Sequence, residues 1–242
     1  MVRVIRGRAP TIDADRAASE SLLEIAAAGE PAIRVWTPHR QVAFGRRDRH
    51  CAGYERAREA ALEAGFTPVE RDVGGRAVAY DGETTLAFAR AEPVSDFRRG
   101  TDERYVRTTE AVVHGLSAVG VTLERGEPDD SFCPGAHSLS VRVPAAGAAT
   151  TQQKVVGIAQ RVRTDAAITA GIVLVDGRET MSHILESIYD ALAVPFDPTS
   201  VGTVADASCP TDPERVRTAL ETTLVGDADA VTESVQTLID VD

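Results

Sequence analysis

The chain contains a single lysine, Lys154, within the stretch TTQQKVVGIAQR, whereas arginine supplies every other side chain that is permanently basic. Arginine cannot replace lysine where the group must lose a proton or act as a compact point donor. The one position that keeps an amine is therefore a candidate catalytic residue. On composition alone, chance survival of a lysine at a junction between a loop and a strand explains it equally well.

A second candidate is Cys133, which precedes a Pro-Gly pair in the stretch DDSFCPGAHSLS. A Pro-Gly turn is rigid and would fix the position of the thiol. Asp129 and Asp130 lie close by in sequence, and carboxylates disfavour a thiolate. A reactive Cys133 therefore needs a compensating cation, for which Lys154 and His137 are the candidates. The alternative is a half-buried, inert cysteine in a turn, the usual state of a free cysteine.

The third candidate is the glycine pair Gly74-Gly75 in ERDVGGRAVAYDGETTLAFA, flanked by Arg71 and Arg76. Glycine has no Cβ and permits the backbone to approach a bound group closely. The two arginines are suited to hold a carboxylate or a phosphate. The alternative is a plain glycine turn between two strands, which is common in hairpins.

The remaining composition limits the classes of function. The 242 residues have a formal net charge of −11 at pH 7, which disfavours nucleic-acid binding. The acidic, lysine-poor composition is typical of a halophilic cytoplasm. Three cysteines of unsuitable spacing and five scattered histidines predict neither a disulfide framework nor a metal site. No apolar run is long enough for a signal peptide or a membrane span, so we expect a cytoplasmic protein without a membrane partner.

These residues must be positioned by a fold in which hairpins alternate with helices, and this pattern predicts an α+β class with a mixed, largely antiparallel sheet flanked by helices. We expect residues 1–200 to form a catalytic domain and 201–242 a small helical appendage of the same unit. The predicted helices cover residues 11–30, 53–65, 102–120, 180–192, 212–224 and 227–240. The predicted strands lie at 2–7, 32–36, 41–45, three within 67–91, and at 121–124, 137–143, 153–163 and 166–175. Residues 144–153 read as an exposed, mobile loop.

Three stretches, RVWTPHRQVAFGRRDR, VERDVGGRAVAYDGETTLAFA and QKVVGIAQR, resemble in this order the strand motifs of the biotin/lipoate protein ligase catalytic-domain superfamily. The positions that match the family pattern are Arg71, Gly74, Gly75, Ala77, Val78, Lys154, Gly157 and Ala159. Val73 stands where the ligases usually have serine, and Arg76 where they often have a third glycine. FCPGAHSLS is similar to the segment with the acyl-accepting cysteine in the cysteine-dependent octanoyl and lipoyl transferases. The stretch between Ser140 and Lys154 is longer than usual in the family.

The resemblance implies an acyl site over the sheet, with Cys133 as nucleophile and Lys154 as its partner. It implies substrate-binding roles for Arg71, Gly74, Gly75, Arg76, Ala77, Gly157 and Ala159. The implied partners are an octanoyl or lipoyl group and either lipoyl-domain proteins, such as E2 subunits and the glycine cleavage H protein, or an acyl carrier protein. The implied transfer requires no cofactor and no metal.

Two other functions stay open. An ATP-dependent lipoate ligase, or its catalytic subunit, would need ATP and Mg²⁺, and Lys154 would then bind the acyl-adenylate while Cys133 is incidental. A non-catalytic module that binds lipoyl or biotin groups would leave the presence of both Cys133 and Lys154 unexplained.

Overall fold

The computed structural model describes residues 1–71, 74–144, 149–207 and 212–239. These residues form a large and a small sheet. The eight strands of the large sheet run in the order β11 (Ala230–Ser234), β1 (Val2–Arg6), β2 (Ala32–Trp36), β6 (Thr85–Pro93), β10 (Ala166–Leu174), β9 (Thr150–Val162), β8 (Ser138–Pro144) and β7 (Glu124–Arg125). Strand β1 is parallel to both of its neighbours, and the other pairs are antiparallel. The predicted mixed, largely antiparallel sheet is thus confirmed.

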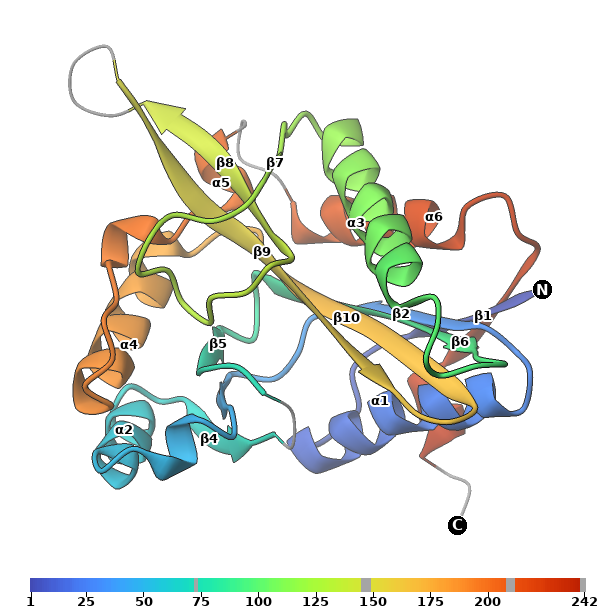
Figure 1. The fold of residues 1–242 in the computed structure, drawn as a ribbon, viewed down its shortest axis with the longest axis horizontal. Helices are drawn as coiled ribbons and strands as arrows, with labels where there is room; N and C mark the ends of the chain where they lie inside the picture. Colours follow the sequence, from blue (N-terminus) through green and yellow to red (C-terminus); the bar gives the residue numbers. More distant parts are fainter. Residues whose placement is uncertain (72–73, 145–148, 208–211, 240–242) are drawn as a thin grey trace.

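Helices cover both faces of the large sheet. The α-helices are α1 (Ile12–Ala27), α2 (Tyr54–Glu63), α3 (Thr101–Ala118), α4 (Arg178–Ala191), α5 (Val204–Ala207) and α6 (Pro213–Val225), and the short 3₁₀ helices are η1 (Asp48–His50), η2 (Pro198–Ser200) and η3 (Val235–Leu238). Helices α3 and α6 lie side by side on one face, and α1 lies on the other (Figure 1). The sheet is therefore the middle layer of the molecule.

The apolar stripes of the helices explain this arrangement. In α1, Ala18, Leu22 and Leu23 are buried against the sheet, and the Thr11 side chain accepts a hydrogen bond from the N–H of Ala14 to begin the helix. On the opposite face, Val112 of α3 joins the apolar core beneath the strands. The central strand β6 is buried on both sides, as a strand between two helical layers must be.

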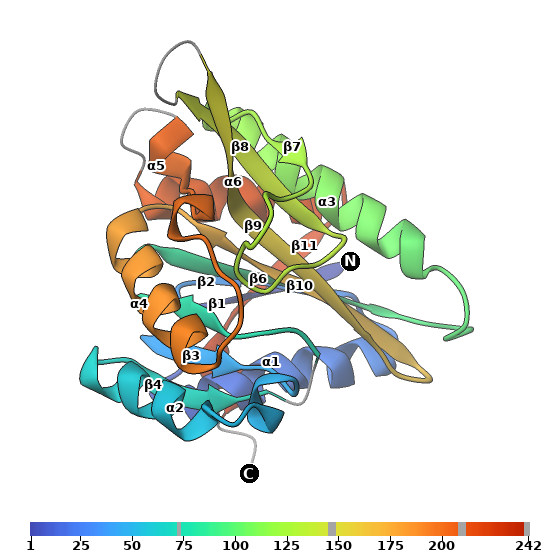
Figure 2. The ribbon, with the colours of Figure 1, turned by 60° about the vertical axis from the view of Figure 1, so that its left-hand side comes forward.

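The small sheet lies next to the large one and contains β4 (Thr67–Glu70), β3 (Gln41–Phe44) and β5 (Val78–Tyr80), in this order. Helices α2 and α4 pack on each other and complete a separate apolar cluster with this sheet. Figure 2 shows β3, β4, α2 and α4 together on the side of the large sheet where α1 lies. The space between the two sheets is where the candidate site lies.

Three local predictions were wrong. Within the helix predicted at 227–240, residues 230–238 form β11 and the short η3 instead of one continuous α-helix, because the backbone of β11 pairs in parallel with β1 and Glu233 forms a two-pronged ion pair with Arg3. Residue 240 lies outside the described residues. The strand predicted near 121–124 is only the two-residue β7. Residues 150–153 belong to β9, whose pairing with β8 extends to Pro144, so the predicted loop is shorter. Residues 145–148 of that predicted loop lie outside the described residues.

Candidate active site

A cleft of about 390 Å³ lies between the two sheets on the side of α1. Its walls are largely apolar and include Phe88, Ile158 and Ile172 from three neighbouring strands of the large sheet. Five of the residues to which the sequence analysis gave a catalytic or binding role line this one cleft: Arg71, Cys133, Lys154, Gly157 and Ala159. The fold therefore brings together residues separated by up to 88 positions in the chain. An apolar cleft with a few polar groups is a typical site for a small ligand.

Cys133 lies in a loop between β7 and β8 and has a backbone φ of +41°, in the left-handed region that disfavours residues with a Cβ. Its N–H donates a hydrogen bond to the hydroxyl of Tyr189 at 2.6 Å. That hydroxyl in turn donates to the carbonyl of Ala77 at 3.1 Å. Tyr189 thus connects the cysteine loop to the segment that follows the glycine pair.

The Cys133 sulfur accepts two hydrogen bonds from residues on either side of the glycine pair. The Arg71 Nη2 and the backbone N–H of Arg76 both lie 3.4 Å from Sγ. Arg71 Nη2 also donates to the Arg76 carbonyl at 2.6 Å, which fixes the guanidinium beside the sulfur. A guanidinium and an N–H directed at sulfur stabilise negative charge there, the form in which cysteine is nucleophilic.

The cation whose side chain donates to the Cys133 sulfur is Arg71, whereas the two candidates from the sequence, Lys154 and His137, make other contacts. Lys154 Nζ donates to Glu127 Oε2 at 2.7 Å and to the carbonyls of Phe132 at 2.8 Å and Cys133 at 3.0 Å. The other candidate, His137, stacks on Tyr105 with ring centroids 3.5 Å apart. Sequence order alone could not show that Arg71 lies closer to the sulfur, because this contact spans 62 residues.

The environment of Lys154 also explains why this position is a lysine. The side chain is only 1% exposed, and its three acceptors converge on one nitrogen. An ammonium has three rotatable donors on a single atom, whereas a guanidinium distributes its donors over a planar fork. The lone amine matches a compact three-acceptor pocket that also holds the backbone of the cysteine loop.

Glu127 was missed in the sequence analysis and anchors this pocket. Besides Lys154, it accepts hydrogen bonds from the N–H of Gly135 at 2.8 Å and from the Ser138 hydroxyl at 2.7 Å. Burial alone would raise the pKa of Glu127, but the hydrogen bonds from Lys154 and Ser138 outweigh it and lower that pKa. In the sequence, Glu127 is one of three nearby acids, and nothing distinguishes it from Asp129 and Asp130.

The two glycines of the pair differ in their surroundings. Gly75 has a φ of +94°, and a Cβ there would lie 2.9 Å from the Cys133 sulfur and 3.1 Å from Arg71 Nη2. A Cβ at Gly74 would meet nothing within 4 Å. A Cβ at Gly45, at the end of β3, would lie 2.2 Å from the Gly75 carbonyl oxygen, so Gly45 is a further glycine required by close packing. The close approach expected at the pair is thus a property of Gly75 and involves the thiol.

The other predicted binding residues take different positions. Arg76 extends away from the sulfur, and its Nη1 lies 3.3 Å from Asp48 Oδ1 and 3.4 Å from Cys51 Sγ. Ala77 is fully buried in the apolar cluster of the small sheet. Neither lines the cleft, so their contribution to the site is through the backbone. Gly157 and Ala159 lie in the wall formed by β9.

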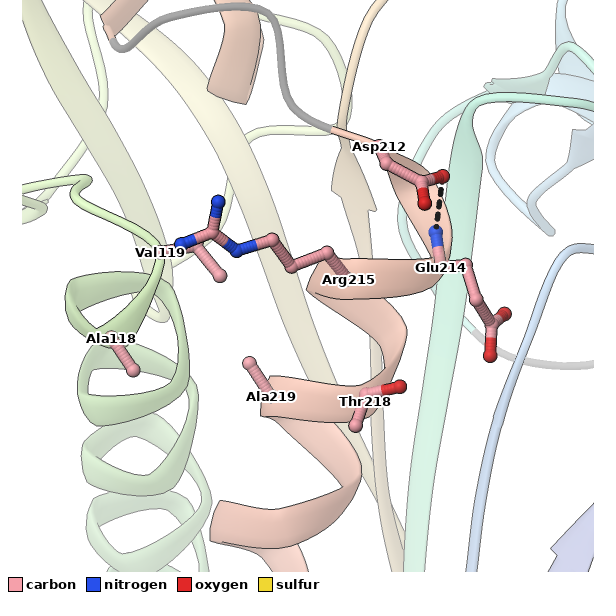
Figure 3. A pocket seen from close by; sticks show the side chains of 7 residues that line it. All are labelled: Ala118, Val119, Asp212, Glu214, Arg215, Thr218 and Ala219. Carbon is pink, nitrogen blue, oxygen red and sulfur yellow. Dashed lines mark hydrogen bonds between the residues drawn. The ribbon is translucent and has the colours of Figure 1, made fainter.

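A second hollow of about 450 Å³ lies on the opposite side of the large sheet, between the end of α3 and the start of α6. Figure 3 shows its small side chains, Ala118 and Ala219, and the long side chain of Arg215 pointing toward Val119. Among the described residues that line it there is no cysteine and no buried ionisable side chain, and we assign it no chemistry.

Metal ligands and membrane spans were also sought within the described part of the chain. It contains no cluster of three or more His, Cys, Asp or Glu side chains arranged to hold a metal ion. None of its helices has the length and apolar character needed to cross a membrane. Cys209, the third cysteine, lies outside these residues.

The fold and the cleft define a catalytic domain of the lipoate ligase type. Over residues 14–225 the chain matches the family described as the lipoyl protein ligase A/B catalytic domain, and it belongs to this family. The resemblance identified from the sequence motifs is thereby confirmed.

Two curated relatives are octanoyltransferases. The octanoyl-[GcvH]:protein N-octanoyltransferase of Anoxybacillus flavithermus is 28% identical over 159 residues, which are 63% of this chain and 52% of that protein. Octanoyltransferase LipM of Kyrpidia tusciae is 28% identical over 182 residues, which are 70% of this chain and 65% of that protein. The chain thus spans between half and two thirds of the length of these relatives.

Solved lipoate ligases share the fold. A bi-partite lipoate protein ligase, described with its E2 lipoyl domain from Thermoplasma acidophilum, has a TM-score of 0.68 at 20% identity, over 98% of this chain and 90% of that one. Lipoate-protein ligase A bound with ATP has a TM-score of 0.67 at 20% identity, over 98% of this chain and 92% of that one. At this level of identity the likeness establishes the common fold.

Proposed function

We propose that the protein transfers an octanoyl or lipoyl group to a lysine of a lipoyl-domain protein through a thioester on Cys133. The observation that supports this most directly is the pair of donors on the Cys133 sulfur, from Arg71 and from the N–H of Arg76, in a cleft with apolar walls. The names of the two octanoyltransferase relatives agree with the proposal. The acceptor would be a lipoyl domain of an E2 subunit or of a glycine cleavage H protein.

The transfer has two half-reactions. The Cys133 sulfur attacks the donor carbonyl, a carbon–sulfur bond replaces the donor's bond to its own thiol or amine, and that leaving group takes up the thiol proton. The acceptor lysine then attacks the thioester, an amide forms, and the Cys133 sulfur leaves and regains a proton from the attacking amine. Thioester to amide is downhill and amide to amide is near balance, so neither route needs ATP.

The chain's own groups suit the charges that develop. Arg71 and the Arg76 N–H donate to the resting sulfur, so they would also lie next to a carbonyl bonded to that sulfur and would stabilise its oxyanion. The apolar walls suit an eight-carbon chain better than a charged substrate. In this scheme Lys154 holds the carbonyls of Phe132 and Cys133 and keeps the loop in place.

An ATP-dependent lipoate ligase is the second candidate, because Arg71 and Lys154 are both cations that line the cleft. When bound, ATP would activate the acyl carboxylate as an adenylate, and Arg71 and Lys154 would be candidates to face its phosphate, together with Arg16 and Arg161, which also line the cleft. The three hydrogen bonds of Lys154 within the protein leave it less suited to this role than Arg71.

The deciding experiment is intact-mass analysis after incubation with octanoyl-carrier protein or octanoyl-H protein without ATP. We expect one octanoyl adduct that hydroxylamine removes, because a thioester is labile to it and an amide is not. Cys133→Ala should form no adduct, whereas the matched controls Cys51→Ala and Cys209→Ala should form it normally. Full activity of Cys133→Ala together with a requirement for ATP would contradict the transferase and establish the ligase.

A further inference from the structure

The backbone of Cys133 is held from both sides by side chains of other elements. Its N–H is bound by Tyr189 of α4, and its carbonyl by Lys154 of β9. A residue with a Cβ adopts a positive φ only where its surroundings enforce it, and such residues cluster at functional sites. At Cys133, whose φ is +41°, these two contacts hold the backbone on both sides.

On the N–H side, the Tyr189 hydroxyl bridges two segments. It accepts from Cys133 and donates to the Ala77 carbonyl. Ala77 directly follows Arg76, whose N–H is one of the two donors to the Cys133 sulfur. Burial raises the pKa of Tyr189 well above its usual range, so the hydroxyl keeps the proton with which it donates. One hydroxyl therefore fixes the distance between the sulfur and its donor.

On the carbonyl side, Lys154 is held by Glu127. The carboxylate accepts hydrogen bonds from Lys154 Nζ, from the N–H of Gly135 within the Pro-Gly turn, and from the Ser138 hydroxyl beyond the turn. Lys154 in turn donates to the carbonyls of Phe132 and Cys133. Glu127 thus joins both ends of the cysteine turn through one carboxylate.

We propose that Tyr189 and Glu127 are positioning residues that hold Cys133 in its left-handed conformation and its sulfur against Arg71 and the Arg76 N–H. This inference rests on the proposed function for the reaction that the sulfur performs. It concerns the geometry of the thiol, which can be measured without any acyl group.

The first test compares Tyr189→Phe with Tyr54→Phe. Both remove a hydroxyl from the same apolar cluster, but Tyr54 bonds Glu70 at 2.8 Å and makes no hydrogen bond to Cys133. The rate of Cys133 alkylation by iodoacetamide is read by peptide mass, and kcat and KM are measured for octanoyl transfer. For Tyr189→Phe we expect alkylation and kcat to fall by about 10- to 100-fold, the scale on which a misplaced reacting group costs rate. KM should stay within about twofold, and Tyr54→Phe should match the wild type in all three.

The second test is Glu127→Gln, which keeps the size of the side chain and removes its charge. Its kcat and alkylation rate should fall in the same way, with KM again little changed, and folding is checked by thermal unfolding. The proposed positioning role of Tyr189 and Glu127 is overturned if both variants are folded and if their rates of Cys133 alkylation and octanoyl transfer equal those of the wild type. If the wild type accepts no octanoyl group from any donor, the proposed function fails. The alkylation rates alone then still test whether Tyr189 and Glu127 position the thiol.

Discussion

Two buried cation–carboxylate pairs border the same cleft, and they use different cations. Lys154 pairs with Glu127 beside the Cys133 loop, and Arg34 pairs with Asp15 of α1. Lys154 and Asp15 both line the cleft. Apart from Lys154, the permanently basic side chains of this chain are all arginine. The contrast between the two pairs therefore indicates why position 154 requires a lysine.

The acceptors around Arg34 are spread out. Its two terminal nitrogens donate to the Asp15 carboxylate, the Ser19 hydroxyl and the carbonyls of Asp15 and Gly7. Its guanidinium also stacks on Trp36, 4.2 Å from the ring centroid. A planar fork satisfies such an arrangement and a point charge does not. At Lys154 the acceptors converge instead, so acceptor geometry, rather than the presence of a carboxylate, distinguishes the two sites.

The largest expected effect comes from Lys154→Arg. A guanidinium cannot direct three donors from one atom and is larger than the pocket built for an ammonium, so it must displace the carbonyls of Phe132 and Cys133. We expect octanoyl transfer to fall by at least about 10²-fold, because the sulfur moves from its donors, while the fold survives. The turnover rate measures octanoyl transfer, and circular dichroism shows whether the fold survives. Near-normal turnover would refute the requirement for an amine.

The reverse swap, Arg34→Lys, should act mainly on stability. The ammonium keeps the charge but leaves part of the spread acceptors unsatisfied and loses the stacking on Trp36. We expect the free energy of unfolding to fall by about 1–3 kcal/mol, the cost of buried polar groups without partners. Urea denaturation measures this, and transfer per folded molecule should change far less than in Lys154→Arg. If Arg34→Lys lowered transfer per folded molecule as much as Lys154→Arg does, the contrast between the two pairs would be contradicted.

The two pairs also show what the sequence could and could not predict. Cys133 and Lys154 were found because their types and motifs are unusual in this chain, and most helices and strands followed from local periodicity. Glu127 and Tyr189 were missed because an acid among acids and a tyrosine on the apolar side of a helix have no local signal. Their roles come from contacts across 27 and 56 residues.

The same limit applies to secondary structure at the edge of the sheet. In residues 227–240 the apolar residues Val231, Val235 and Leu238 follow the spacing of a helix. The first of them lies in β11, because pairing with β1 satisfies the backbone there. Tertiary pairing overrode the local pattern, as it often does for strand propensity.

A smaller effect is expected in the pH dependence of stability. Because the pKa of Glu127 is lowered in the folded state, its ionised form stabilises the fold above the ordinary carboxyl pKa of about 4.3. This contribution is lost as the pH falls through the lower, folded pKa. The difference in unfolding free energy between wild type and Glu127→Gln should therefore shrink as the pH is lowered into that range. A difference that grows on acidification would have the wrong sign for a carboxylate stabilised by Lys154.

The smallest expected effect separates buried from exposed pairing. Glu124 of β7 pairs with Arg142 of β8 at 2.8 Å, but both side chains are about half exposed, at 43% and 54%. Exposed pairs contribute little and are screened by salt, whereas buried pairs are screened much less. Glu124→Gln should therefore lower stability slightly at low salt and hardly at all at about 1 M, where the Debye length is roughly 3 Å. The loss caused by Glu127→Gln should persist at both salt concentrations.

Chemical denaturation with urea, which is uncharged, measures both variants under matched ionic strength. If salt removed the effect of Glu127→Gln to the same extent, solvent would reach the Lys154 pair, and the compact pocket that explains the lone lysine would not hold in solution.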